Sequence, residues 1–335
     1  MTDQPEIIPV PAAAFKDRKT TLLVFGILGI IAGAMCVLMA PLMLLSLTIQ
    51  QSEPNAKVAT VPLGTMVPGM VFYILLGAWF ITMGIGSIKC RRWARALILV
   101  SSWLWLIMGI IALVIMVMLL PNMNQELVNK EIMPPQAVLI MKIITIVTVS
   151  VLYIAMPAVL ILFYKGPNVK ATCEQRDPKV RWTDKCPLPV LAVSLITAFW
   201  ALCLPMMGFY GWAMPFFGTI ITGLAGAAFA IVLMALLVYV AWGTYHLKMG
   251  AWWTVISLAV LVVVSNIITF SRVTLLDLYS SMNYPPEMME RMKSYMPDQT
   301  GLLIVWLVSL VLAWGYLIYI RRFFTKPAVA VGSNQ

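Results

Sequence analysis

The chain has 335 residues, of which 61% are hydrophobic and only 11% are charged, with a formal net charge of +10. Soluble domains are about 45–50% apolar and about 25% charged, so the composition excludes an ordinary soluble protein and predicts a polytopic membrane protein. The positive charges are spread over short loops and form no basic stripe with interleaved aromatic residues, which argues against nucleic-acid binding.

Eight apolar segments are long enough to cross a bilayer, which requires about 20 residues of helix. We expect these spans at residues 20–49, 69–88, 95–120, 137–164, 188–207, 216–242, 251–275 and 301–320. The first span is too long for the core of a signal peptide, so we interpret it as a retained helix. The fifth and sixth are separated only by a stretch rich in Gly, Pro and aromatic residues, 208–215. The predicted fold is an all-α integral membrane protein.

Lysine and arginine residues gather on one side of the predicted membrane. With the N-terminus in the cytoplasm, 17 of the 23 basic residues lie on the cytoplasmic side and six on the other. Short cytoplasmic loops carry an excess of Lys and Arg, so we expect both termini to be cytoplasmic. The expected location is the inner (cytoplasmic) membrane of a bacterium, where the lipid bilayer is the first partner.

The eight predicted spans resemble two sets of four. The second and sixth spans end in GSIKCR from Gly86 and GTYHLK from Gly243, at an offset of 157, and the loops after the third and seventh spans each contain a Pro pair, Pro134-Pro135 and Pro285-Pro286. Both sets begin on the same side, so they would be parallel repeats. The predicted organisation is a tail at 1–19, a first repeat at 20–165, a connector at 166–187, a second repeat at 188–322 and a tail at 323–335.

The connector includes the stretch ATCEQRDPKVRWTDKC, residues 171–186, in which charges are unusually dense for this chain. A flexible linker would be rich in Gly and Ser, so this composition predicts a segment that docks on the helices. The arginines are expected to pair with nearby acids or with lipid phosphates, and the tryptophan suits an interface. The expected docking residues are Arg176, Asp177, Arg181, Trp182 and Asp184.

Two cysteines, Cys173 and Cys186, bracket this charged stretch. Structural disulfides are rare in the cytoplasm, so a disulfide is not expected. Cys90 and His246, at the ends of the second and sixth spans, would complete a Cys₃His metal site. Zinc sites normally contain closely spaced ligand pairs, which this sequence lacks. We therefore favour no metal and expect no cofactor.

The predicted spans have no ionisable residue at their centres, which argues against a transporter that depends on intramembrane carboxylates. One asparagine, one serine and three prolines lie within the spans and define a possible solute site. Helix packing is the simpler interpretation of the asparagine, and helix bending is the simpler interpretation of the prolines. These residues are Pro41, Pro157, Pro205, Ser265 and Asn266.

The loop before the last span, NYPPEMMERMKSYMP, has methionines at 288, 292 and 296. This helical spacing raises two interpretations, a Cu(I) site of thioethers or an amphipathic helix lying on the membrane. The second is favoured because Met commonly fills apolar faces.

No catalytic motif is present: the chain has a single His and lacks the P-loop, HExxH and GxSxG patterns. We expect a protein that is not an enzyme. Three functions stay open. The first is a membrane scaffold or accessory subunit that contacts other membrane proteins or a second copy. The alternatives are a transporter or channel for a neutral or apolar solute or lipid between the repeats, and a metal-binding protein of the cytoplasmic face.

Overall fold

The computed structural model describes residues 15–52, 63–129, 134–282, 284, 289–290 and 299–325. This part contains eight helices that are long and apolar enough to span a membrane. The expectation of a helical, multi-pass membrane protein is thereby confirmed. The loop methionines Met288, Met292 and Met296, for which an amphipathic helix was favoured over a copper site, lie outside the described residues.

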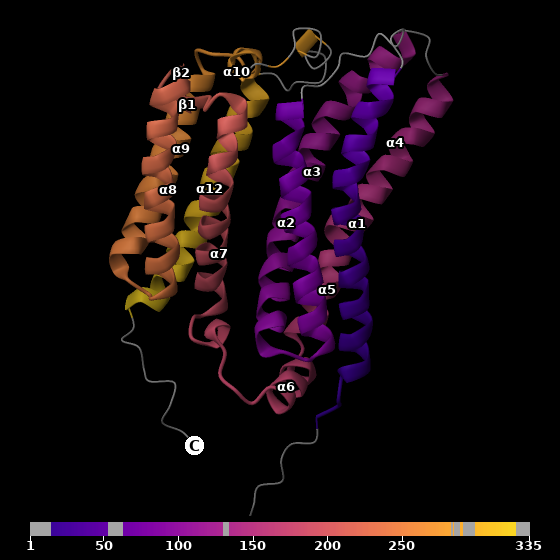
Figure 1. Ribbon diagram of the computed structural model, residues 1–335, viewed down its shortest axis with the longest axis vertical. Coiled ribbons are helices and arrows are strands. Elements are labelled where there is room, and N and C mark those ends of the chain that lie inside the picture. The colour runs from indigo at the N-terminus through magenta and orange to yellow at the C-terminus, as the bar shows by residue number, and fades with distance from the viewer. Residues whose placement is uncertain are drawn as a thin grey trace, which may run out of the picture.

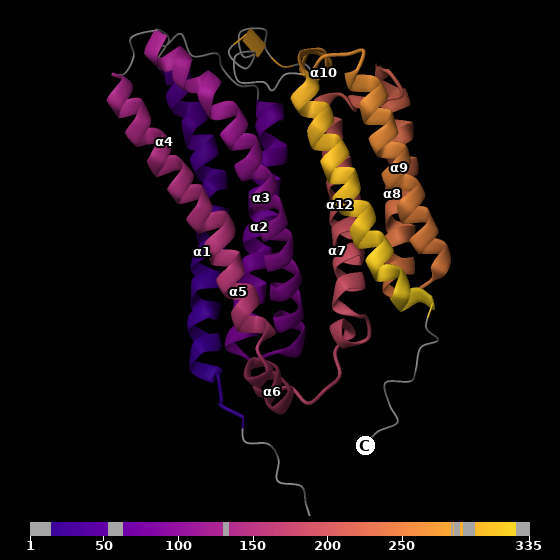
Figure 2. The same cartoon turned by 180° about the vertical axis from the view of Figure 1, so that it is seen from behind.

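The spanning helices stand in two groups of four, side by side (Figures 1 and 2). The group that we call the first bundle consists of α1 (Lys19–Ser52), α2 (Leu63–Ile88), α3 (Arg92–Asn129), α4 (Pro135–Ser150), η1 (Val151–Ala155) and α5 (Met156–Lys165), of which the last three form one span. The second bundle consists of α7 (Leu188–Cys203), η3 (Leu204–Tyr210), α8 (Gly223–Tyr245), α9 (Met249–Phe270) and α12 (Gln299–Thr325).

A short helix, α6 (Pro167–Arg176), lies at one end of the molecule next to the first bundle, and from it the chain passes to the second bundle (Figures 1 and 2). We call this the connector end. The start of α1 and the last turn of α12 are also at this end, whereas α10 (Leu275–Ser281) lies at the opposite end (Figure 1). The connector continues into a 3₁₀ turn, η2 (Trp182–Asp184). The charged stretch is thus folded, with a helix that its sequence did not predict.

The sixth span begins later than expected, because residues before Gly223 form a β-hairpin. Its strands are β1 (Met214–Phe216) and β2 (Thr219–Ile221). The two turn residues between them, Phe217 and Gly218, have φ angles of 39° and 98°. A two-residue hairpin turn with positive φ at both positions matches the twist of its strands, so this turn favours strand over helix. The prediction of a helix from residue 216 was wrong for this reason.

The span formed by α4, η1 and α5 changes its helical geometry just before Pro157. Proline has no N–H for the carbonyl of Tyr153, and its ring crowds that carbonyl in a regular α-helix. The five residues of η1 adopt a π-helix there. On the facing helix, a Cβ added to Gly109 would lie 2.3 Å from the Tyr153 carbonyl oxygen. The glycine lets α3 approach this carbonyl.

Each bundle has a buried cluster near the connector end. The first includes Leu22, Met83, Leu97 and Tyr164, and the second includes Val190, Leu191, Trp252, Leu317 and Ile320. Many large apolar side chains farther along the helices are exposed, as expected for surfaces that face lipid.

The corner between α2 and α3 and the corner between α8 and α9 have the same backbone geometry. Cys90 and Leu247 have φ angles of 51° and 54°. The Cys90 N–H donates to Ser87 O at 2.9 Å, as the Leu247 N–H donates to Thr244 O at 2.9 Å. We call residues 87–92 the first corner and residues 244–249 the second corner. Both are Schellman-type helix ends with a residue other than the usual glycine in the left-handed position.

Candidate functional site

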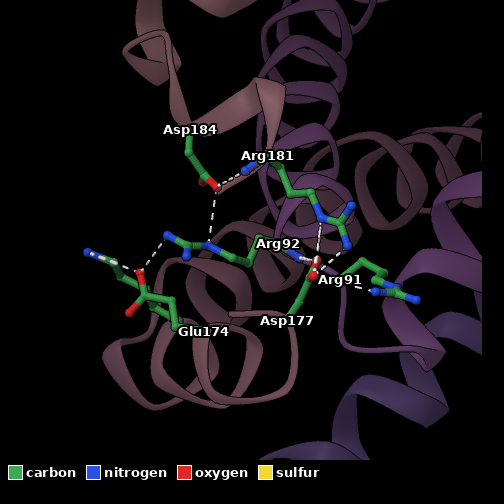
Figure 3. A network of polar contacts seen from close by, with 7 residues as sticks. Arg91, Arg92, Glu174, Asp177, Arg181 and Asp184 are labelled. Atoms are coloured by element: carbon green, nitrogen blue, oxygen red, sulfur yellow. Dashed lines mark hydrogen bonds and ion pairs between the residues drawn. The ribbon is translucent and has the colours of Figure 1, made fainter. Parts of the chain in front are cut away.

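The carboxylate of Asp177, directly after α6, is the centre of a polar network between the connector and the first corner (Figure 3). Its side chain is only 2% exposed. Arg181 Nε donates to both carboxylate oxygens, at 2.9 and 3.1 Å. Arg91 Nη1 lies 3.4 Å from one oxygen, and the Arg92 backbone N–H donates to the other at 3.3 Å. Asp177 therefore joins the connector to the first turn of α3.

Hydrogen bonding from Arg181 is the main reason why the pKa of Asp177 lies below its usual value. The backbone N–H of Arg92 and the charge of Arg91 lower the pKa of Asp177 further. A carboxylate that is held by several donors and has a lowered pKa is poorly suited to act as a general base near neutral pH. The geometry favours a structural ionic contact.

The side chain of Arg92 extends this network in two directions (Figure 3). Its Nε lies 3.2 Å from Asp184 Oδ2, and its Nη2 lies 3.5 Å from Glu174 Oε1. Asp184 also accepts the backbone N–H of Arg181 at 2.9 Å. One arginine at the start of α3 thus contacts both α6 and η2.

Arg176 binds elsewhere than the sequence led us to expect. It forms an ion pair with Asp17 at 2.9 Å, rather than with an acid of the connector. On the neighbouring turn of α6, Thr172 Oγ1 accepts the backbone N–H of Arg18 at 3.1 Å. These contacts hold the segment before α1 against the connector.

Trp182 contacts the second bundle. Tyr245, the last residue of α8, donates its hydroxyl to the Trp182 carbonyl at 2.9 Å, and the two rings lie 6.4 Å apart. The structure therefore brings Asp177, Arg181 and Asp184 into one network and turns Trp182 toward the other bundle. The sequence did not predict that Arg91 and Arg92 contact the acidic side chains of the connector. The basic run CRRWAR, which contains both arginines, was the signal that could have indicated it.

The structure separates the four residues of the conceivable metal site. Cys90 and Cys173 belong to the buried cluster of the first bundle, and Cys186 belongs to that of the second. The ring of His246 is exposed, with Nδ1 2.8 Å from Trp242 O. Among the described residues, no group of three or more His, Cys, Asp or Glu side chains is placed to hold a metal ion.

The buried connector cysteines should be slow to react with thiol reagents. Burial raises the pKa of Cys173 and of Cys186 to about 12, and their side chains are 1% and 3% exposed. Since the thiolate is the reactive form, we expect maleimide to modify neither in the folded protein, whichever side it is added from. Mass spectrometry before and after denaturation measures this. Rapid labelling of Cys173 in the folded protein would contradict the expected burial.

Ser265 and Thr269, one turn apart on α9, bind the hairpin turn through their hydroxyl groups. Ser265 Oγ accepts the N–H of Phe217, and Thr269 Oγ1 accepts the N–H of Gly218, both at 3.0 Å. Asn266 Nδ2 donates to Val262 O of its own helix at 2.8 Å. The hydroxyl groups of Ser265 and Thr269 therefore bind the hairpin, a role that the sequence did not indicate.

The three helix prolines do not gather with these polar residues. Pro41 and Pro157 lie in the first bundle, in α1 and α5, whereas Pro205 lies in η3 of the second. Pro157 is buried, and the other two are exposed. The five residues of the possible solute site are thus divided between the two bundles.

Replacing both Ser265 and Thr269 with Ala is expected to loosen the hairpin turn. The N–H groups of Phe217 and Gly218 would lose their partners, and an unpaired buried donor such as that of Gly218 costs about 1–3 kcal/mol. Hydrogen exchange of these two amides should become at least about tenfold faster, since about 1.4 kcal/mol corresponds to a factor of ten. The matched control is Thr254→Ala, on the same helix, whose hydroxyl donates to Gly250 O of that helix. Equal exchange in both variants would argue against this role.

Comparisons with protein-family models, curated proteins and solved structures gave no match.

Proposed function

We propose that the protein is a non-catalytic membrane scaffold or accessory subunit built from two helical bundles held by a docked connector. The observation that carries this proposal is the double attachment of the connector. Asp177 binds the first corner, and Trp182 accepts a hydrogen bond from Tyr245 of the second bundle. A segment attached to both bundles supports a fixed relative position for them, which a binding platform needs.

The buried polar groups of the spans support the same proposal. Ser87 Oγ donates to Leu22 O at 2.9 Å, joining α2 to α1. Ser194 Oγ donates to Ala241 O at 2.6 Å, joining α7 to α8. Among described residues, Thr183 Oγ1 in the connector is the one buried side-chain oxygen or nitrogen that has no hydrogen-bond partner. Such use of polar groups is typical of helix packing.

A purification from native membranes tests the scaffold function. The tagged full-length chain would be extracted with its lipid in polymer nanodiscs and analysed by size-exclusion chromatography with light scattering and mass spectrometry. We expect a defined complex, with a second membrane protein or a second copy present in stoichiometric amount. A monomer without such a partner would overturn the proposal.

We further propose that the two bundles are parallel repeats, as the offset of 157 predicts. The matching corners support this proposal. At the same offset, a Cβ added to Gly86 would lie 2.5 Å from Ala94 Cβ, and one added to Gly243 would lie 2.5 Å from Ala251 Cβ. Two corners that share their backbone angles, hydrogen bonds and close glycine–alanine contacts are the expected result of a duplicated four-helix unit.

The proposed orientation has the connector end in the cytoplasm of a bacterium with an inner membrane. The native connector cysteines are too buried to report it, so exposed positions are needed. We expect Lys179→Cys to resist an impermeant maleimide added to intact cells and to react after lysis. Ser280→Cys, exposed on α10 at the opposite end, is the matched control and should react in intact cells. The reverse labelling pattern would overturn the orientation.

One observation favours the alternative function of a transporter for a neutral or apolar solute or lipid. The π-helical segment η1 beside Pro157 interrupts a span, and such segments frequently occur at functional sites. A flux assay in proteoliposomes, with lipid scrambling as one readout, distinguishes the two functions. Flux above that of protein-free liposomes would favour transport over a scaffold.

A further inference from the structure

Three basic side chains at the connector end of the second bundle lie over aromatic rings. Lys248 Nζ is 3.7 Å from the centre of the Trp242 ring. Arg321 Cζ lies 5.2 Å from the ring of Trp252, and Arg322 Cζ lies 4.1 Å from that of Tyr319. The ion pairs found among the described residues include none of these three cations. Their charges are thus left without a described carboxylate.

One hydrogen bond joins the two helix ends next to which the three cations lie in the sequence. Trp252 Nε1 donates to Leu317 O at 2.9 Å, and this contact fixes the first turn of α9 against the last turns of α12. Trp252 is buried, and Arg321 lies across its ring from the neighbouring helix. We call Lys248, Arg321 and Arg322 the basic cluster.

The first corner shows what this backbone geometry can bind. There, the N–H of Arg92 and the side chain of Arg91 both contact the carboxylate of Asp177. At the offset of 157, Lys248 corresponds to Arg91 and Met249 to Arg92. The second corner therefore has the same backbone geometry, with a cation before the start of α9 at the matching position. No described carboxylate forms an ion pair with Lys248.

We propose that the basic cluster, with the start of α9, binds the phosphate of an anionic phospholipid. Arginine presents a planar fork of donors that matches phosphate oxygens, and lysine adds a compact charge. The positive end of the α9 dipole favours the same anion. The Asp177 carboxylate at the first corner is the counterpart within the chain of this lipid phosphate.

A lipid is favoured over a free anion by the surroundings of the cluster. Trp242 and Trp253, at the same end of α8 and α9, are 49% and 55% exposed. Tryptophan side chains at the ends of spans typically lie at the level of lipid headgroups. A phospholipid whose phosphate binds beside these tryptophans can place its acyl chains along the exposed apolar sides of α8 and α9.

Native mass spectrometry of the full-length protein with phosphatidylglycerol tests the proposal. The site variant combines Lys248→Gln, Arg321→Gln and Arg322→Gln. The matched control combines Lys89→Gln, Lys165→Gln and Lys179→Gln, exposed residues at the same end that belong to none of the described ion pairs. Both variants lose three charges, so they lower nonspecific attraction to anionic lipid equally.

We expect the wild-type protein to retain phosphatidylglycerol in preference to phosphatidylcholine. The site variant should lose at least about tenfold more affinity than the control, because both variants lose the same diffuse attraction and only the site variant also loses the phosphate contacts. Equal loss in both variants would overturn the proposal in favour of diffuse surface attraction. Displacement of the lipid by millimolar inorganic phosphate would overturn it in favour of a free-anion site. The test does not depend on the scaffold function.

Discussion

Replacing Asp177 with Asn is expected to lower the free energy of unfolding by about 3 kcal/mol. Removing one member of a buried ion pair costs about 3–5 kcal/mol, because the remaining charge loses its compensation. The low end applies here, since Arg181 and Arg91 are 29% and 41% exposed and water screens part of their charge. Chemical unfolding in mild detergent, followed by tryptophan fluorescence, measures the difference.

Glu174→Gln is the matched control for this variant. Glu174 lies on the same connector, and its substitution removes the same charge. Its side chain, however, is 41% exposed, and its contacts with Arg92 and Lys170 are long, at 3.5 and 3.9 Å. Exposed pairs of this kind contribute about 0.2–1 kcal/mol. If both variants lost the same stability, the special role of the buried carboxylate would be disproved.

The lowered pKa of Asp177 also predicts a loss of stability in acid. The folded-state pKa lies below the unfolded value of about 3.9, so the folded protein binds fewer protons from this group. The contribution of the Asp177 carboxylate to the free energy of unfolding is complete above about pH 4 and declines as the pH falls through the folded-state pKa. The Asp177→Asn variant should lose less stability over this range than wild type. Asp17 and Asp277 also have lowered pKa values, so the variant keeps some dependence on pH.

The eight spans were predictable because the length of an apolar segment alone decides whether a helix can cross a bilayer. The β-hairpin was not, since the residues from Met214 to Ile221 are as apolar as a helix end. What distinguishes them is a turn at Phe217 and Gly218 and two side-chain acceptors, Ser265 and Thr269, about 50 residues away. Hydropathy carries no information about such distant partners.

The contacts of the connector also divide into those that the sequence could predict and those that depend on the tertiary fold. The pair Arg181–Asp177 lies four residues apart and was accessible from sequence. The contact between Arg92 and Asp177 joins residues 85 positions apart, and that between Arg176 and Asp17 joins residues 159 apart. Composition indicated that the segment docks, but the tertiary fold decided which arginine met which acid.

Replacing Gly84 with Leu is expected to destabilise the first bundle by about 3 kcal/mol, because the backbones of α1 and α2 nearly touch there. A Cβ added to Gly84 would lie 2.6 Å from the Gly26 carbonyl oxygen, and one added to Gly26 would lie 2.7 Å from that of Gly84. Gly33 and Gly77 form the same reciprocal contact at 2.7 Å, two helical turns away. Overpacking costs about 1–3 kcal/mol, and the upper value applies where backbone rather than side chain must move.

Gly315→Leu in α12 provides the control, because a Cβ at Gly315 would meet no atom within 4 Å. This variant should be neutral or slightly stabilising, since glycine costs about 1 kcal/mol within a helix. Similar losses in the two variants would show that the α1–α2 contact has no special tightness.

The α1–α2 contact also affects the connector. Ser87 of the first corner donates to Leu22 on α1, so separating the helices displaces the corner that binds Asp177. Combining Gly84→Leu with Asp177→Asn should therefore cost less than the sum of the single variants, and strict additivity would show that the two contacts are independent.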